Sequence, residues 1–335
     1  MSGYLSRERK VAIEAVEQAS KVCKLVFKQL VEGETLTKGD KSPVTFADFS
    51  AQAIVNSILE KHFPNDPIVG EEDSKDLQGE SGEKLRSKVV ELTNLVISPS
   101  LSEDQILKAI DRGQYEGGKS GRFWTLDPID GTKGFLRGEQ YAVCLALIED
   151  GKVKLGVLGC PNLPHDINNE HNTGRGSIFV AVKGRGAFRR PLGGSDEDET
   201  PIKASSITDL TKTKFCESVE SGHTSQSDSA TIANKLGITL PPVRMDSQCK
   251  YGCIANGDAD IYLRLRVSAT YVEKIWDHAA GSILVAEAGG RVSDTNGDEL
   301  DFSQGRRLEK NVGVVAANAS IYDKVIEAVK AQVSS

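Results

Sequence analysis

Carboxylates stand beside turn-forming residues at three widely separated places in this sequence. The three motifs are Gly70-Glu71-Glu72, Asp127-Pro128-Ile129-Asp130-Gly131-Thr132 and Trp276-Asp277. Oxygen ligands of this kind suit hard cations such as Mg²⁺. The backbone N–H groups of Gly131 and Thr132 can also face an anion. A magnesium ion with a bound phosphate is therefore the interpretation that uses every part of these motifs.

The central hexapeptide places two carboxylates, Asp127 and Asp130, three residues apart. Pro128 lacks an N–H group and cannot extend a central strand, so we expect the preceding strand, 123–126, to end there. A tight turn then directs both carboxylates and the Ile129 carbonyl toward one point. The alternative is an ordinary Asp-Pro turn followed by an Asp-Gly turn.

The other acidic positions also have simple structural explanations, which the sequence leaves open. Glu71-Glu72 can be a solvated loop, and Asp277 can cap the start of a helix. Asp48 follows Thr45 by three residues, as in a capping box. The functional interpretation of Asp48 is a base that, together with Thr132, orients a metal-bound water.

The composition is that of an acidic globular protein. The chain has 335 residues, a net charge of −7 and 39% hydrophobic residues. This charge argues against a broad nucleic-acid-binding or membrane-binding surface. No stretch approaches the roughly 20 apolar residues of a membrane helix, and the N-terminus lacks the apolar segment of a secretory signal. We therefore expect a cytoplasmic protein with two domains or one large one.

The cysteines are scattered, and most lie in apolar runs. They are Cys23, Cys144, Cys160, Cys216, Cys249 and Cys253. No two of them form a CxxC pair, so a zinc site is not indicated. We expect buried free thiols in a reducing compartment rather than disulfides.

The apolar pattern of the first half predicts helices followed by hairpins. The expected elements are helices at 5–30 and 46–62, a strand at 68–69, short helices at 85–90 and 106–110 within a polar insertion over 73–120, and hairpins of 141–148 with 152–157 and of 178–182 with 187–188. The Asp150-Gly151 pair is a strong signal for the first hairpin turn.

Beyond the acidic, glycine-led loop 193–199, strands and helices alternate. We expect strands near 215 and 243 and at 259–265 and 312–317, with helices at 226–236, 247–256, 277–288 and 320–332. Alternation of this kind indicates an α/β layer. The loop is the predicted boundary between an N-terminal α+β domain (1–200) and a C-terminal α/β domain (201–335).

Cations and hydroxyls recur in the second half of the chain. They lie in Gly222-His223-Thr224-Ser225, Asp246-Ser247-Gln248-Cys249-Lys250 and Tyr262-Leu263-Arg264-Leu265-Arg266. Taken singly, each has an ordinary explanation as a surface histidine, a helix cap or an arginine at a strand end. His278 is interpreted as a residue on a helix face rather than as a ligand.

Together, the acidic motifs resemble the signature of the magnesium-dependent, lithium-inhibited phosphatase superfamily, which includes inositol monophosphatase and fructose-1,6-bisphosphatase. Within it, the chain is most similar to fungal 3′(2′),5′-bisphosphate nucleotidases. The segments that carry this likeness include Ser42-Pro43-Val44-Thr45, Tyr115-Glu116-Gly117-Gly118, 127–140, Asp246-Ser247-Gln248, Tyr262-Leu263-Arg264-Leu265 and 274–281. The likeness runs nearly end to end and is weakest at 73–120 and 162–175.

The resemblance implies a layered αβαβα sugar-phosphatase fold with an antiparallel-rich N-terminal sheet. It implies two or three Mg²⁺ ions held by Glu71, Asp127, the Ile129 carbonyl, Asp130 and Asp277, with Glu72 acting through water or a neighbouring ligand. Asp48 and Thr132 would activate the attacking water, and Gly131 and Thr132 would bind phosphate. His223, Ser247, Lys250 and Arg264 match positions that hold a nucleotide.

The activity implied by the resemblance is removal of the 3′-phosphate from adenosine 3′,5′-bisphosphate (PAP), with action on 3′-phosphoadenosine 5′-phosphosulfate (PAPS) as well. Inhibition by Li⁺ and Na⁺ and a monomeric state are also expected, without nucleic-acid or membrane partners. The nearest rival is an enzyme resembling inositol polyphosphate 1-phosphatase. A more remote alternative is a catalytically silent nucleotide sensor.

Overall fold

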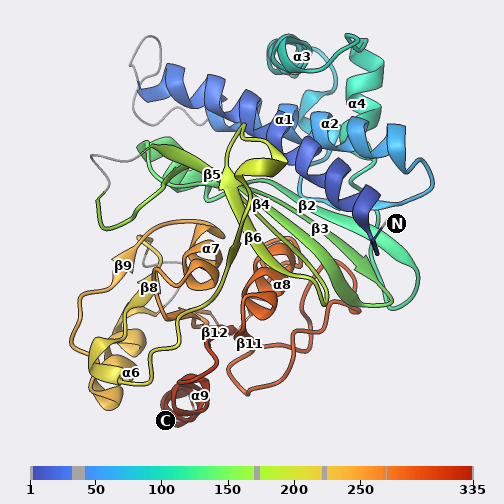
Figure 1. Cartoon of the computed structure of the whole chain (residues 1–335). Helices are drawn as coiled ribbons and strands as arrows, with labels where there is room; N and C mark the ends of the chain where they lie inside the picture. The colour runs from blue at the N-terminus through green and yellow to red at the C-terminus, as the bar shows by residue number, and fades with distance from the viewer. Residues whose placement is uncertain (1–2, 32–41, 170–173, 221–224, 269, 334–335) are drawn as a thin grey trace.

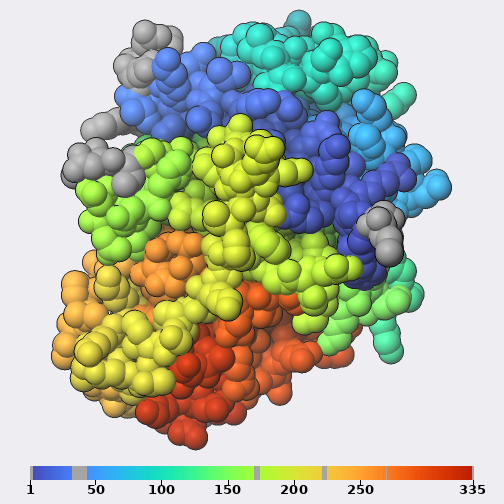
Figure 2. All heavy atoms as spheres, in the orientation of Figure 1, coloured from blue at the N-terminus to red at the C-terminus, as the bar shows by residue number. Residues whose placement is uncertain are grey.

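The computed structural model of the chain describes residues 3–31, 42–169, 174–220, 225–268 and 270–333. These segments form alternating layers of helix and sheet, as Figure 1 shows. The helices of the three helical layers are α1 (Ser6–Val31) with α2 (Ser42–His62), α7 (Cys249–Asn256) with α8 (Ala279–Glu287), and α6 (Gln226–Leu236) with α9 (Tyr322–Val333). Figure 2 shows the N-terminal helices, in blue, and the C-terminal segments, in red, toward opposite ends of the molecule. The predicted αβαβα class is confirmed.

The first sheet has seven strands in chain order. They are β1 (Ile68–Gly70), β2 (Arg122–Asp130), β3 (Ala142–Glu149), β4 (Lys152–Pro164), β5 (Arg175–Val182), β6 (Gly186–Pro191) and β7 (Thr200–Ile202). Only the β1–β2 pair among them is parallel. Both predicted hairpins are present. At the β3–β4 turn Asp150 and Gly151 have φ of 50° and 72°, which a tight turn between twisted strands requires.

Both faces of the first sheet are buried, because alternate residues of its strands meet different helices. Trp124 and Leu126 pack with the apolar faces of α1 and α2. Phe123 points to the opposite side and belongs to the apolar cluster that includes residues of α7 and α8. The central strands therefore carry continuous apolar runs, which is why β3 reads as Ala-Val-Cys-Leu-Ala-Leu-Ile.

The second sheet has five strands in the order β11-β12-β10-β8-β9. They are β8 (Phe215–Glu217), β9 (Val243–Arg244), β10 (Ile261–Arg264), β11 (Gly290–Ser293) and β12 (Val314–Asn318). Tyr262 faces the α7–α8 layer, whereas Ile261 and Leu263 face α6 and α9. The same two helices, α7 and α8, thus lie between both sheets, which is the arrangement that brings distant motifs together.

One strand departs from the sequence prediction. β2 does not end before Pro128 but continues to Asp130. Its register against β3 shifts between Asp127 and Asp130, which pair with Cys144 and Ala142. One extra residue on β2 makes this a bulge, and β1 has already ended opposite Leu126, so the missing N–H of the proline interrupts no ladder.

Further differences concern the lengths of elements. The insertion carries α3 (Glu83–Val96) and α4 (Glu103–Asp111), both longer than predicted, and they pack on α2 through a separate small apolar cluster. The sequence prediction missed β11 and the short helix α5 (Thr132–Arg137). Short 3₁₀ turns occupy Ser74–Leu77, Asp196–Asp198 and Leu210–Lys212.

The acidic loop 193–199 precedes β7, the last strand of the first sheet. The change from the first sheet to the second therefore falls between Ile202 and Phe215. The domain division at residue 200 stays a prediction.

All six cysteines are buried and free, as predicted. Among the described residues, no helix combines the length and apolar character needed to cross a membrane.

We expect Gly156→Ala to destabilise the fold, because β4 and α8 touch at this glycine. A β-carbon there would lie 2.7 Å from the Ala280 carbonyl oxygen and 2.6 Å from Ile283 Cγ2. Overpacking of this kind costs about 1–3 kcal/mol. Thermal unfolding measures the effect, with Gly3→Ala as the matched control, since its new methyl meets only ordinary van der Waals contacts. Equal melting temperatures for the two variants would contradict the close packing of these layers.

Candidate active site

A cavity of about 340 Å³ opens where the first sheet, α5, α7 and β10 meet. The predicted site residues that line it are Glu71, Asp127, Ile129, Asp130, Gly131, Thr132, Ser247, Lys250, Arg264 and Asp277. Asp48 and Glu72 lie beside it, and His223 lies outside the described residues. The cavity is therefore acidic on the side of the first sheet and carries cations on the side of α7 and β10.

The carboxylates converge because β1 and β2 run parallel. Gly70 pairs with Leu126, so Glu71 and Asp127, the next residue of each strand, emerge at the same edge of the sheet. Their carboxyl groups lie close enough for each to influence the pKa of the other. Asp130 follows after the bulge, and Asp277 arrives from the turn that precedes α8. Three segments far apart in sequence thus meet at one point.

The electrostatics of this cluster fit a bound cation. Burial raises the pKa of Asp127 well above its usual range, and the nearby charges of Glu71, Asp130 and Asp277 raise it further. The pKa of Asp277 is likewise raised, first by burial and then by Asp130. Within the described part of the chain, Asp127 Oδ1 is buried without a hydrogen-bond partner. A divalent cation would coordinate the unpaired Asp127 oxygen and offset the repulsion among the carboxylates. The residues present therefore fit such an ion.

Two supports hold the Glu71-Glu72 turn in place, and the sequence analysis missed both. The Gln52 side chain donates to the Glu72 carbonyl at 2.6 Å and accepts from the Glu72 N–H at 3.1 Å. Arg306 donates to the Gly70 carbonyl at 2.5 Å and stacks over the Trp276 ring, with its guanidinium carbon 4.9 Å from the ring centroid. The turn is therefore held from α2 and from the C-terminal half, although Glu71 itself is exposed.

Gln248 fixes the opposite side of the cluster, and the sequence analysis missed this role as well. Its backbone N–H donates to Asp130 Oδ2 at 2.6 Å. Its side chain donates to the Trp276 carbonyl at 2.7 Å and accepts from the Gly281 N–H at 2.9 Å. One buried residue thus ties Asp130 to the segment that carries Asp277. A glutamine two residues after an aspartate has no sequence signature for this task.

The backbone makes its closest approach at Gly131. This residue has φ of 87°, and a β-carbon on it would lie 2.9 Å from Ser247 Cβ. Ser247 also has a positive φ of 67°, which is uncommon for a residue other than glycine and is found mostly where function requires it. The close contact lets α5 begin directly against the loop that precedes α7. A side chain at position 131 would separate the two.

Asp48 is a buried residue of α2 rather than part of a capping box. The helix already begins at Ser42, so Thr45 lies inside its first turn and the capping alternative is wrong. Burial raises the pKa of Asp48 well above its usual range, with further contributions from Glu72 and Glu71. The pKa of Glu72 is raised to about 7 by burial and by Glu71. Since α2 also contacts α5, the helix that begins with Thr132, Asp48 lies beside the acidic cluster.

Comparison with known proteins assigns the chain to a family. The sequence model described as "Inositol monophosphatase family" matches residues 5–334. The chain belongs to the inositol monophosphatase family. Members of this family depend on metal ions, which agrees with the carboxylate cluster.

Similar proteins bear out the branch that the sequence resembles. A protein from Schizosaccharomyces pombe named 3′(2′),5′-bisphosphate nucleotidase is 49% identical over 98% of this chain and 96% of its own length. One of the same name from Dictyostelium discoideum is 45% identical over 97% of each. A solved inositol monophosphatase from Zymomonas mobilis shares the fold, with a TM-score of 0.62, 20% identity, and coverage of 98% of this chain and 99% of that chain. The predicted resemblance and the enzyme class, a phosphoric monoester hydrolase, are confirmed.

In this family member two cations, the buried Lys250 and the partly buried Arg264, face the acidic cluster across the cavity. Lys250 donates to the carbonyls of Ser247 at 2.8 Å and Met245 at 3.4 Å, and its ammonium lies 5.3 Å from the centroid of the Tyr262 ring. Burial lowers the pKa of Lys250, while Asp130 opposes this shift. Arg264, at the end of β10, donates from Nε to Glu273 at 3.1 Å.

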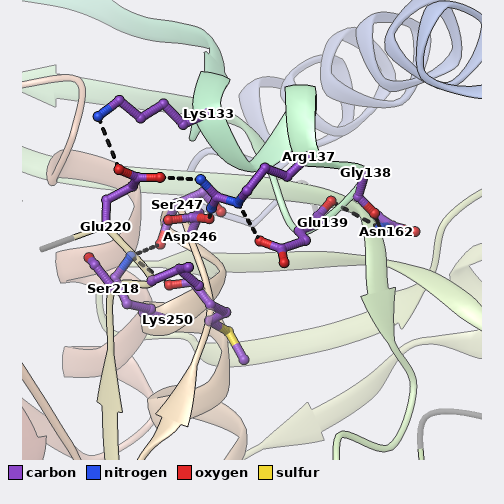
Figure 3. Close-up of polar contacts among 12 residues, drawn as sticks. Lys133, Arg137, Gly138, Glu139, Asn162, Ser218, Glu220, Asp246, Ser247 and Lys250 are labelled. Carbon is purple, nitrogen blue, oxygen red and sulfur yellow. Dashed lines mark hydrogen bonds and ion pairs between the residues drawn. The ribbon is translucent and has the colours of Figure 1, made fainter. Parts of the chain in front are cut away.

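An ion-pair network holds the loop before Lys250 against α5, as Figure 3 shows. Arg137 of α5 contacts both Glu220 and Asp246, and Lys133 reaches Glu220 at 3.1 Å. Asp246 immediately precedes Ser247. The network therefore joins α5 to the segment that presents Ser247 and Lys250.

Two alternatives from the sequence analysis are corrected here. The residue at the N-cap position of α8 is His278, not Asp277, so Asp277 is free for another role. His278 lies at the N-cap of α8 rather than on a helix face, and it is buried between Tyr251 and Glu273. Burial raises the pKa of Glu273, yet the contacts with His278 and Arg264 outweigh it and lower this pKa to about 2.

We expect Asp127→Asn to stabilise the metal-free protein. A carboxyl whose pKa is raised on folding contributes stability at low pH, and that stability is lost as pH rises through the folded pKa. An amide removes this loss, so the melting temperature without metal should rise by a few degrees at neutral and alkaline pH. The rise that Mg²⁺ causes in the wild type should largely disappear.

Thermal shift with and without Mg²⁺ measures both effects. Asp298→Asn, the same change at an exposed position, is the control. A full Mg²⁺ response in Asp127→Asn would remove this residue from the ligand set.

Proposed function

We propose that the chain hydrolyses the 3′-phosphate of PAP in a Mg²⁺-dependent reaction that yields AMP and phosphate. The observation that supports this most directly is the division of one cavity into an acidic side and a side that carries Lys250 and Arg264. An acidic cluster with metal suits a phosphoester. Cations opposite it suit a substrate with a second anionic group, as in PAP or PAPS. The names of the similar proteins agree with this substrate class.

The proposed metal ligands are Glu71, Asp127, the Ile129 carbonyl, Asp130 and Asp277, with Glu72 acting through water, and we propose two or three ions. When bound, Mg²⁺ supplies a Lewis acid that lowers the pKa of a coordinated water and stabilises charge on the phosphoryl group. Li⁺ and Na⁺ are proposed to inhibit by competing for one of these positions.

The residues of the chain supply positioning and proton transfer. Asp48 accepts the proton of the attacking water on its carboxylate, and Thr132 orients that water through its hydroxyl. The water oxygen forms a bond to phosphorus while the bond from phosphorus to the 3′-oxygen breaks. Backbone N–H groups of Gly131 and Thr132 stabilise the phosphoryl oxygens.

The nucleotide is proposed to extend toward α7 and β10. Ser247 lies beside Gly131, and Lys250 and Arg264 line the same cavity. Arg264 is proposed to bind the 5′-phosphate, since its planar fork suits an anionic oxygen pair. His223 stays a predicted nucleotide contact.

A phosphate-release panel tests the function. We expect the purified chain, in Mg²⁺, to act on PAP in preference to inositol 1,4-bisphosphate and fructose 1,6-bisphosphate, and to lose activity in millimolar Li⁺. Preference for the inositol bisphosphate would favour the rival phosphatase. Binding of PAP without phosphate release would favour a silent sensor.

We expect Asp48→Asn to keep the fold and lose turnover by about 10²–10⁴-fold, because a general base contributes this much. Steady-state kinetics on PAP measure the loss, and circular dichroism with thermal unfolding checks the fold. A variant that unfolds earlier but turns over at the wild-type rate would show that Asp48 has only a structural role.

A further inference from the structure

We propose that Tyr251, His278 and Glu273 form a hydrogen-bonded chain that holds Arg264 in the cavity, and that selectivity for a second phosphate group depends on this chain. This inference rests on the proposed function, in which Arg264 meets the 5′-phosphate. The three residues would act as positioning residues, because each works through Arg264 and not on the reacting phosphate.

Every hydrogen bond of the series Tyr251–His278–Glu273–Arg264 is present in the structure. The Tyr251 hydroxyl lies 2.8 Å from His278 Nδ1, and His278 Nε2 lies 2.9 Å from Glu273 Oε2. The other oxygen of Glu273, Oε1, accepts from Arg264 Nε at 3.1 Å. One carboxylate thus divides its two oxygens between the histidine and the arginine, which fixes the plane of the guanidinium.

The direction of the hydrogen bonds follows from chemistry. An ionised Glu273 can only accept, so His278 Nε2 carries the proton. The contact between His278 Nδ1 and the Tyr251 hydroxyl is the next hydrogen bond in the series. Tyr251 and His278 are each only 1% exposed and Glu273 5%, so water does not replace any link. Breaking one of these hydrogen bonds would leave buried polar groups unpaired. Because this costs free energy, the four side chains are held rigidly.

The Arg264 guanidinium is held at Nε, and its opposite edge makes one long contact. Nε is taken by Glu273, and Nη2 makes a long contact of 3.4 Å to the Tyr271 hydroxyl. Within the described part of the chain, Nη1 has no partner, and Arg264 lines the cavity. The Nη1–Nη2 edge is therefore available for an anion, in the orientation that Glu273 sets.

The local backbone is built to admit this chain. A β-carbon at Gly281 would lie 2.2 Å from Tyr251 Cδ2, so only a glycine lets the tyrosine ring lie against the first turn of α8. This gives a physical reason for the glycine in the segment Asp277-His278-Ala279-Ala280-Gly281, which the carboxylate site by itself leaves unexplained. The Tyr251 ring also packs edge-on against Tyr262, which underlies Lys250.

A separate metal site at Glu273, Asp277 and His278 is a weaker interpretation of the same residues. Their ligand atoms lie within 4.8 Å of one another. However, both oxygens of Glu273 are already engaged, and the Arg264 guanidinium beside them repels a cation.

Tyr251→Phe tests the proposal, since it removes one hydroxyl and keeps the ring that fills the core. We expect the ratio of kcat/KM for PAP to that for 3′-AMP to fall about five- to tenfold, mostly through KM for PAP, as for loss of one positioning hydrogen bond. The Kd of 5′-AMP in Mg²⁺ should rise by a similar factor. Glu273→Gln should show the same pattern more strongly, and Arg264→Ala should show it most strongly.

Tyr322→Phe is the matched control, because it deletes another buried hydroxyl, bonded to Ser293 far from the cavity. It should leave both the ratio and the Kd unchanged. In Tyr251→Phe, equal losses of kcat/KM on PAP and 3′-AMP, or an unchanged Kd for 5′-AMP, would overturn the proposed role of the hydrogen-bonded chain. The proposed function would still stand. Wild-type protein that releases no phosphate from PAP would contradict the proposed function. Wild-type protein that binds no 5′-AMP would contradict the proposed role of Tyr251, His278 and Glu273.

Discussion

Repulsion among carboxylates gathered in a partly buried space is the constraint on which the rest of this structure depends. Asp127 is buried, and Glu71, Asp130 and Asp277 surround it. Like charges in such a place oppose folding unless something neutralises them or holds them by force. The protein holds the carboxylates with rigid supports from Gln52, Arg306 and Gln248, and the proposed metal ions would neutralise their charge.

The supports come from parts of the chain with no shared motif. Gln52 and Arg306 grip the turn that carries Glu71, while Gln248 bonds to Asp130 and to both sides of the Asp277 turn. Each uses an amide or a guanidinium whose partners are mainly backbone carbonyls and N–H groups. Such supports satisfy buried polar groups without adding to the negative charge. They fix the position of each carboxylate while adding nothing to the repulsion.

The cationic side of the cavity follows a different logic. Two backbone carbonyls hold Lys250, and Glu273 holds Arg264. Both arrangements leave part of the cationic group available for another contact. The pairing of Arg264 with Glu273 also reduces the net positive charge, so the proposed recognition of an anion there would depend on the geometry of the guanidinium more than on bulk attraction. The position of α7 and α8 between the two sheets puts this side within one cavity of the acids.

The sequence by itself determined the local chemistry and most of the elements. Asp127-Pro128-Ile129-Asp130-Gly131-Thr132 indicated a metal and phosphate motif, and apolar periodicity located helices such as α1, α6 and α9, because both depend on neighbours within a few residues. Only the tertiary structure decided that β2 passes through Pro128, since this depends on where β1 ends and on a bulge against β3. It also decided the roles of Gln248 and His278, whose side chains resemble many others in sequence. Their function arises from partners such as Trp276 and Glu273, which the packing of α7 against α8 brings within hydrogen-bonding distance.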